Sequence, residues 1–315
     1  MAAKSFFKGS WQLIRETFKG FTDHKITKLS GSLAYYTVFS MAPLLVVIIA
    51  LSGLFLEKEA IEGEVYEVLR GFMGENTAQQ LQEIIKNSAL TGKKNFAAIV
   101  GAITLLIGAT TVFAEIQDSI NSIWGLKVKP KRGWLKLIKD RVLSFSVVIS
   151  LGFLLLVSLA ISGVVEALNK RLQQMYPDVA VVVFYILNLA ITLGLSMLIF
   201  AVIFKVLPDA RIRWRNVMVG AFITSILFLL GKFGISLYVS NSDIGSTYGA
   251  AGSLVVLLVW IYFSSIILYL GAEFTRAWSL QYGDEIKPGK YAVTTKQVEV
   301  ETGNAPVEKL DKEGK

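Results

Sequence analysis

The chain has 315 residues, of which 53% are hydrophobic, and its mean hydropathy is +0.55. A soluble domain rarely sustains such values over this length, so the composition indicates a membrane protein. The net charge of +8 would suggest nucleic acid for a soluble protein, but here attraction to anionic lipid headgroups explains it. The absence of cysteine excludes disulfides and thiolate metal sites, and a single histidine, His24, excludes a multi-histidine metal centre. We therefore expect no nucleic-acid partner, metal or cofactor.

Residues 1–30 predict an amphipathic helix. Apolar residues recur there at three- and four-residue spacing with basic residues mostly between them, and the apolar positions are Phe7, Trp11, Ile14, Phe18 and Phe21. Two placements stay open: the helix lies in the headgroup layer, or it is a cytoplasmic helix packed on the membrane domain. The segment lacks the continuous apolar core and the cleavage site of a signal peptide.

Six long apolar runs follow and predict an all-α, polytopic bundle of six transmembrane helices within residues 31–280. Each run reaches the ~20 residues that a helix needs to cross the hydrocarbon core of a bilayer. The runs are Leu33–Leu54, Phe96–Ile116, Val142–Val165, Val179–Leu207, Val217–Tyr238 and Gly252–Gly271. Pro43 lies inside the first run and predicts a helix kink there, because proline frees the carbonyl four residues earlier.

The segments between these runs alternate between basic and not basic. Residues 1–30 carry six lysines and arginines, residues 117–141 carry seven, and the short segment 208–216 carries three. The intervening segments carry five, two and none, and the five are outnumbered by seven carboxylates. The positive-inside rule then places both termini in the cytoplasm. We expect a multi-pass protein of the bacterial inner membrane.

Three other segments complete the expected organisation. Residues 57–92 show helical apolar spacing and predict a helical periplasmic segment over the outer mouth of the bundle. The small and polar residues of 241–252 predict a tight turn, with a dip into the outer leaflet as the alternative. Residues 281–315 are polar and mixed in charge, which predicts a disordered cytoplasmic tail.

Ionisable residues inside or at the edge of the runs are the candidates for function, since burying one costs ~2.5–3.5 kcal/mol on insertion scales. The predicted topology brings Glu115, Glu273 and Lys205 to the cytoplasmic boundary, with Arg141 at the same level. One interpretation is a polar cluster that binds a proton, a cation or a lipid headgroup. The favoured interpretation is a set of ion pairs that seats helix ends against each other. Lys232 is expected to snorkel to the outer interface.

Four motifs resemble the YihY/BrkB family of membrane proteins in their order and spacing over residues ~30–275. They are Ser32–Leu45, Phe113–Trp124, Lys205–Asp209, and Tyr248–Leu254 with its continuation through Trp260–Tyr262 to Gly271–Glu273. The resemblance implies a bacterial inner-membrane protein with six spans. Members have been labelled ribonuclease BN, a label generally regarded as mistaken, and export of lipid or small solutes is among the proposals for them. The candidate substrate- or ion-binding residues are Glu115, Glu273, Lys205, Arg141, Asp118, Tyr35 and Tyr36.

Three functions compete. The leading hypothesis is a transporter or lipid-handling protein whose partners are membrane lipids and a small solute or lipid substrate. The second is a non-transporting envelope scaffold or assembly factor. The third, a membrane-embedded hydrolase or nuclease, is disfavoured because no Walker A sequence, dinucleotide fingerprint or serine–histidine–carboxylate set is present, so we expect no enzyme. A solvent-accessible cavity that reaches the middle of the membrane and is lined by Glu115 or Glu273 would favour the first over the second.

Overall fold

The structure is a computed structural model that describes most of the chain. The described residues are 2–52, 66, 95–128, 146, 150, 177–241, 252–282, 285–289 and 292–295. The predicted periplasmic segment 57–92 (apart from Tyr66), the third apolar run (apart from Ser146 and Ser150), Arg141 and most of the 241–252 connection therefore lie outside the described residues.

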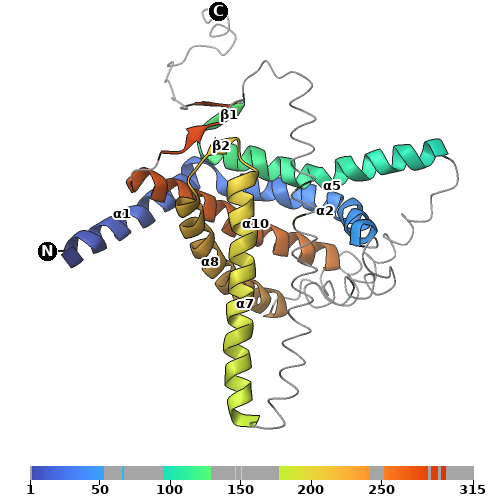
Figure 1. Cartoon of the computed structure of the whole chain (residues 1–315). Coiled ribbons are helices and arrows are strands. Elements are labelled where there is room, and N and C mark those ends of the chain that lie inside the picture. Colours follow the sequence, from blue (N-terminus) through green and yellow to red (C-terminus); the bar gives the residue numbers. More distant parts are fainter. Residues whose placement is uncertain are drawn as a thin grey trace, which may run out of the picture.

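Six long helices make up the described part of the chain (Figure 1). They are α1 (Ala2–Asp23), α2 (Ile26–Ser52), α5 (Asn95–Ile123), α7 (Pro177–Val206), α8 (Trp214–Asn241) and α10 (Gly252–Gln281). Five of the six apolar runs fall in α2, α5, α7, α8 and α10, as predicted. Among the described residues, segments of α7, α8 and α10 are long and apolar enough to cross a membrane: Leu189–Val206, Trp214–Ile235 and Leu254–Gln281. A total of six spans stays a prediction, as does a kink at Pro43, through which α2 continues.

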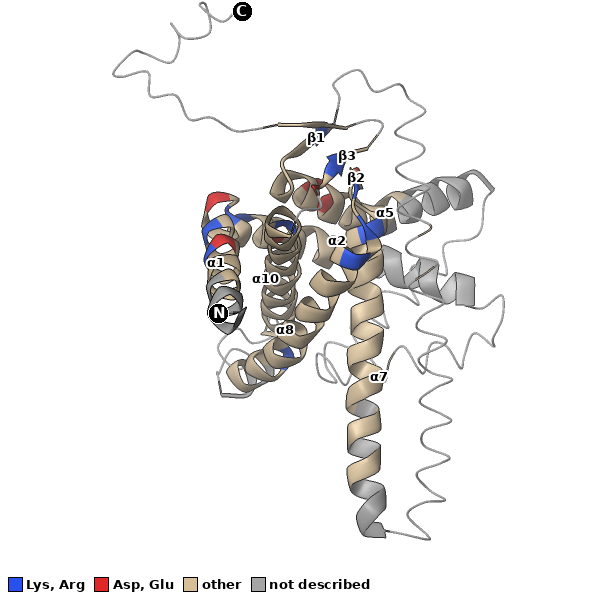
Figure 2. Ribbon diagram, turned by 60° about the vertical axis from the view of Figure 1, so that its left-hand side comes forward, with Lys and Arg blue, Asp and Glu red and all other residues tan. Residues whose placement is uncertain are grey.

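The helices are organised around α10, which contacts α1, α2, α5 and α8. Figure 1 shows α2 and α5 running side by side, whereas α7 packs on α8 and then runs away from them. Buried side chains form the core where the helices converge, and the largest include Tyr269, Phe204 and Ile120. Figure 2 shows that acidic and basic residues gather on α1 and where the strands meet the ends of α5, α7 and α8. We call this region the polar end: the α1–α2 turn, the ends of α5 and α10, and the α7–α8 connection.

Helices α8 and α10 meet in a seam of small residues. A Cβ atom on Gly220 would lie 1.9 Å from Thr275 Oγ1, and one on Gly271 would lie 2.0 Å from Thr224 Oγ1. Each glycine thus makes room for a threonine of the other helix. The helices are antiparallel, so one contact has its glycine on α8 and the next has its glycine on α10. Both hydroxyls donate to a carbonyl four residues earlier in their own helix, at 2.7 Å. The seam is therefore held by close packing, as small residues permit between membrane helices.

Helix α1 packs against the last turns of α10 in the opposite direction. Near the start of α1, the Gly9 carbonyl accepts a hydrogen bond from Gln281 Nε2 at 2.9 Å. Near the end of α1, Gly20 contacts Glu273, which lies about two turns earlier in α10. The face turned inward is formed by three buried residues: Leu13, Thr17 and Gly20. Trp11 and Phe18 on the other side are 71% and 61% exposed. One face of α1 therefore packs on the membrane domain. The opposite face, with its exposed aromatic side chains, is also suited to the lipid headgroup layer.

The C-terminal segment returns to the polar end as two short strands. β3 (Lys287–Pro288) pairs with β2 (Ala210–Arg211) in the α7–α8 connection, and β4 (Ala292–Thr294) pairs with β1 (Leu126–Val128) after α5. Both pairs are antiparallel. This corrects the expectation of disorder from residue 281 onward for residues 285–289 and 292–295. The physical reason is that strands of two or three residues are held by backbone pairing, which leaves no hydrophobic pattern in the sequence.

Candidate functional site

A buried carboxylate lies at the polar end of α10. Glu273 is 1% exposed, and its Oε1 atom accepts a hydrogen bond from His24 Nδ1 and lies 3.6 Å from Arg276 Nη1. Its Oε2 atom is buried and has no hydrogen-bond partner among the described residues. We call Gly20, His24, Glu273 and Arg276 the Glu273 cluster. His24 comes from the α1–α2 turn and Arg276 from the next turn of α10, so the cluster ties α1 to α10.

The local sequence explains why His24 reaches this carboxylate. α1 ends at Asp23, and the His24 N–H bonds the Gly20 carbonyl at 2.9 Å before Lys25 adopts a positive φ of 50°. The chain therefore turns at His24, whose ring faces α10. Gly20 is required there, because its Cβ would lie 2.0 Å from Glu273 Oε1. The glycine and the histidine thus act together, one making space for the carboxylate and the other donating to it.

A second polar group closes the α7–α8 connection and is called the Asp209 network: Gln117, Asn121 and Asp209. Gln117 Nε2 and Asn121 Nδ2 each donate to Asp209 Oδ2 at 3.2 Å, and the Asp209 N–H donates to Asn121 Oδ1 at 2.9 Å. The two amides lie one turn apart on α5 and so share a face. The Gly289 N–H donates to the Asp209 carbonyl at 2.8 Å, which adds the C-terminal segment to the network.

Lys205 and Trp124 make further ties at the same end. The ammonium group of Lys205 donates to the Ile212 carbonyl and lies 5.4 Å from the centre of the Trp214 ring. Trp124 Nε1 donates to the Ala272 carbonyl at 3.1 Å and so joins the end of α5 to α10. Lys205 is therefore engaged within its own connection, whereas Glu273 contacts His24 and Arg276.

The remaining predicted site residues that the structure describes lie on α2 and α5. Glu115 is half-buried on α5, near the buried hydroxyl of Tyr269, which also faces Ser119. Asp118 is exposed on the same helix. Tyr35 and Tyr36 are 58% and 38% exposed on α2 and pack on each other edge to face. Arg141 lies outside the described residues. Sequence reasoning missed His24, although its place at the boundary between two predicted helices, four residues after a glycine, was a usable signal.

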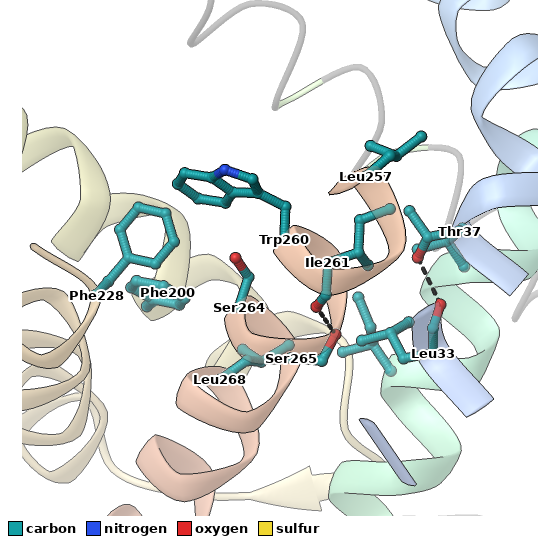
Figure 3. Close-up of a pocket in the computed structure, with 12 residues that line it drawn as sticks. Leu33, Thr37, Phe200, Phe228, Leu257, Trp260, Ile261, Ser264, Ser265 and Leu268 are labelled. Carbon is teal, nitrogen blue, oxygen red and sulfur yellow. Dashed lines mark hydrogen bonds between the residues drawn. The ribbon is translucent and has the colours of Figure 1, made fainter. Parts of the chain in front are cut away.

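A cavity of about 370 Å³ lies between α2, α5, α7, α8 and α10. Its lining is almost entirely apolar and consists of Leu33, Thr37, Val112, Ile116, Phe200, Phe228, Leu257, Trp260, Ile261, Ser264, Ser265 and Leu268. Figure 3 shows Phe200, Phe228 and Trp260 on one side of it and Leu33 and Thr37 on the other.

The few hydroxyl groups in the cavity wall are mostly occupied. Thr37 Oγ1 donates to the Leu33 carbonyl at 2.7 Å, and Ser265 Oγ donates to the Ile261 carbonyl at 2.6 Å, as Figure 3 shows. Neither Glu115 nor Glu273 lines the cavity. The described residues also hold no group of three or more histidine, aspartate or glutamate side chains placed to bind a metal ion. The wall therefore suits an apolar occupant.

The chain is an integral membrane protein of the multi-pass helical class. Its helices are long and apolar, hydrogen bonds connect them at the polar end, and an apolar cavity lies between them. The chain belongs to the virulence factor BrkB family, whose model matches residues 17–294. A UPF0761 membrane protein of Pseudoalteromonas translucida is 30% identical over 260 residues, which cover 80% of this chain and 81% of that protein. One of Vibrio parahaemolyticus is 31% identical over 272 residues, covering 82% and 79%. No solved structure matches the chain.

The extent of the family match agrees with the geometry of the polar end. The match begins within α1 ahead of Gly20 and His24, and it ends at Thr294, the last residue of β4. The Glu273 cluster and both C-terminal strands therefore lie inside the part of the chain that the family shares. The four motifs include Glu273, but Gly20, His24 and the two C-terminal strands lie outside them.

Proposed function

We propose that this protein handles membrane lipids and holds an acyl chain in the cavity between α2, α5, α7, α8 and α10, as part of lipid transport or export. The observation that supports this most is the lining, which is apolar apart from three hydroxyl-bearing residues, two of which donate within their own helices. A charged or strongly polar solute would find few hydrogen-bond partners there, and burying its polar groups without them costs several kcal/mol, about 2–7.

The size of the cavity supports the same class of ligand. At about 370 Å³ it falls within the ~300–1,000 Å³ of ordinary ligand pockets. In a membrane the most abundant molecules with long apolar parts are the lipids. If an acyl chain fills the cavity, the polar headgroup of the lipid lies outside the cavity. The carboxylates of the polar end then need not contact the acyl chain. This separates the proposal from an ion-coupled mechanism centred on Glu115 or Glu273.

The polar residues have a different role in this proposal. Glu273, Asp209 and Lys205 bind groups from neighbouring elements, which supports the interpretation that they seat helix ends against each other. We further infer six spans, both termini in the cytoplasm and a location in the bacterial inner membrane, from the alternation of basic segments. We propose no catalytic step for this protein.

The test is to identify what the cavity holds. Native mass spectrometry of gently extracted protein should detect a bound phospholipid. Ser264→Phe, which puts a large ring into the cavity, should reduce that lipid strongly. The matched control is Leu254→Phe on the same helix, because Leu254 is 45% exposed on the outside, and this variant should retain the lipid. Equal lipid in both variants, or a water-soluble solute in the wild type, would contradict the proposal.

A scaffold without transport is the second candidate, and the α8–α10 seam favours it. Gly220 and Gly271 leave no room for the two helices to move closer, and their threonine partners make hydrogen bonds inside their own helices. Such a fixed pair is what a rigid assembly surface needs. In a strain whose phenotype depends on this protein, Ser264→Phe should leave the phenotype intact if the protein is a scaffold. Loss of function at normal expression favours the lipid-handling role.

A further inference from the structure

Of the exposed cations near the pairing of the α7–α8 connection with the C-terminal segment, three make no ion pair among the described residues. They are Arg211 in β2, Lys287 in β3 and Arg215 in the first turn of α8, and we call them the basic platform. Figure 2 shows basic residues on β2, on β3 and beside the adjoining helix ends. The register sets Arg211 directly opposite Lys287. Two segments 76 positions apart in the chain (287 − 211) therefore bring like charges together.

The pairing of Arg211 with Lys287 has an electrostatic cost. Like charges directly opposite each other in an antiparallel pair destabilise it, and this pair of strands has only two residues on each side. No member of the basic platform makes an ion pair within the part of the chain that the structure describes. The carboxylate of the connection, Asp209, accepts hydrogen bonds from Gln117 and Asn121. Glu285, a described residue two positions before Lys287, is exposed and makes no ion pair with the platform. An anion from outside the protein would remove the cost.

Trp214 indicates where that anion lies. It is 56% exposed and is the first residue of α8, whose apolar segment Trp214–Ile235 is long enough to cross a membrane. Tryptophan at the end of a span favours the level of the lipid headgroups. Arg211 and Arg215 lie on either side of Trp214 in the chain, so the platform lies at the same level. The anions concentrated there are the phosphates of anionic phospholipids.

We propose that the basic platform binds the phosphate group of an anionic phospholipid at the membrane surface, and that Lys287 of the C-terminal segment completes the site. None of its residues lines the apolar cavity, so this inference does not depend on what the cavity holds. Because the phosphate neutralises the repulsion between Arg211 and Lys287, lipid binding and docking of the C-terminal segment stabilise each other. Such coupling is reciprocal by linkage.

The experiment measures the melting temperature of the full-length protein in a neutral detergent during titration with short-chain phosphatidylglycerol. Parallel titrations use short-chain phosphatidylcholine and inorganic phosphate. Phosphatidylglycerol should raise the melting temperature most. The double variant Arg211→Gln/Lys287→Gln should bind it about 25-fold more weakly, from about fivefold for each basic residue near a membrane surface. The control Arg15→Gln/Lys28→Gln removes two exposed charges elsewhere and should lose much less affinity.

The single variant Arg211→Gln should change the melting temperature in opposite directions without and with anionic lipid. Without anionic lipid it should melt no lower than the wild type, because it relieves the repulsion with Lys287. At saturating phosphatidylglycerol it should melt lower than the wild type, because it loses a phosphate contact. The proposal is overturned if the platform and control variants lose affinity equally. It is also overturned if phosphatidylcholine or inorganic phosphate stabilises the wild type as well as phosphatidylglycerol does.

Discussion

The two halves of α10 pack in opposite ways. From Gly271 to Gln281 the helix is held on three sides: α8 meets it at the glycine–threonine seam, α1 at Glu273, and Trp124 of α5 bonds the Ala272 carbonyl. From Leu257 to Leu268 the same helix borders a cavity of about 370 Å³. One continuous helix thus carries both close glycine–threonine contacts and the wall of a cavity.

The sizes of the side chains account for this difference. Small residues at the polar end, such as Gly271 and Thr275, let neighbouring backbones approach closely. In the other half, the rings of Trp260, Phe200 and Phe228 meet around the cavity without filling it. Large rings hold helices apart, and their shapes leave space that smaller residues would close. The polar end is therefore the closely packed part of the helix bundle, and the half lined by aromatic residues has room for a ligand.

The largest expected effect comes from breaking the tight half. Gly220→Ala places a methyl group 1.9 Å from Thr275 Oγ1, so the two helices must separate. We expect a loss of about 3 kcal/mol of unfolding free energy, the upper range for overpacking. The matched control is Gly234→Ala in the same helix, where nothing lies within 4 Å, and it should be neutral or stabilising because alanine favours helix. Unfolding in detergent measures both variants, and equal melting temperatures would contradict the seam.

The next effect concerns the Glu273 cluster. His24→Leu removes the hydrogen bond to a carboxylate that is 1% exposed, which should cost about 2 kcal/mol because the buried acceptor loses its donor. The double variant His24→Leu/Glu273→Gln should recover part of this loss, since a neutral amide leaves no unneutralised buried charge. Thermal unfolding of the two variants decides the matter. A double variant no more stable than His24→Leu would show that the carboxylate is not the source of the cost.

The sequence predicted the apolar helices well, because each run needs only length and composition to be recognised. It also placed Lys205 at a helix end, whereas α10 continues for eight residues beyond Glu273. It could not predict that His24, rather than Lys205, would face Glu273, because that contact depends on how α1 folds back on α10. The position of a side chain along a helix can be predicted from the sequence, whereas its position around the bundle follows from helix packing.

The cavity and the C-terminal strands were beyond the sequence for different reasons. The cavity exists because five helices leave space beside Phe200, Phe228 and Trp260. The sequence of a single helix does not show how closely its neighbours pack. The strands β3 and β4 are too short to show an alternating pattern. Lys287 pairs with a residue 76 positions earlier (287 − 211), and Val293 pairs with one 166 positions earlier (293 − 127). Local pattern reasoning does not reach such distances.

A smaller effect should follow removal of the C-terminal strands. Deleting residues 283–315 takes away β3, β4 and the hydrogen bond from the Gly289 N–H to the Asp209 carbonyl. We expect a loss of about 1–2 kcal/mol. The bonds from the Gly289 and Thr295 N–H groups each contribute about 1 kcal/mol net, while the repulsion between Arg211 and Lys287 is relieved. A control that deletes only residues 297–315 keeps both strands and should match the wild type. If both deletions melt alike, the strands do not support the closely packed half of α10.

The smallest effect is expected in the open half of α10, and it sharpens the comparison most directly. Ser264→Leu adds far more volume than Gly220→Ala does, yet Ser264 faces the cavity, so the larger side chain meets empty space. The leucine also replaces a hydroxyl with apolar surface in an apolar wall. The unfolding free energy should therefore change by no more than about 0.5 kcal/mol, as for a substitution that disturbs no packed group. Melting temperatures of the two variants, measured side by side, rank the two halves of one helix by their tolerance for added volume. If Ser264→Leu lowers the melting temperature as much as Gly220→Ala, the space beside Ser264 is not available to a side chain. It would then not be available to an acyl chain either, and the assignment of a lipid to this cavity would fail with it.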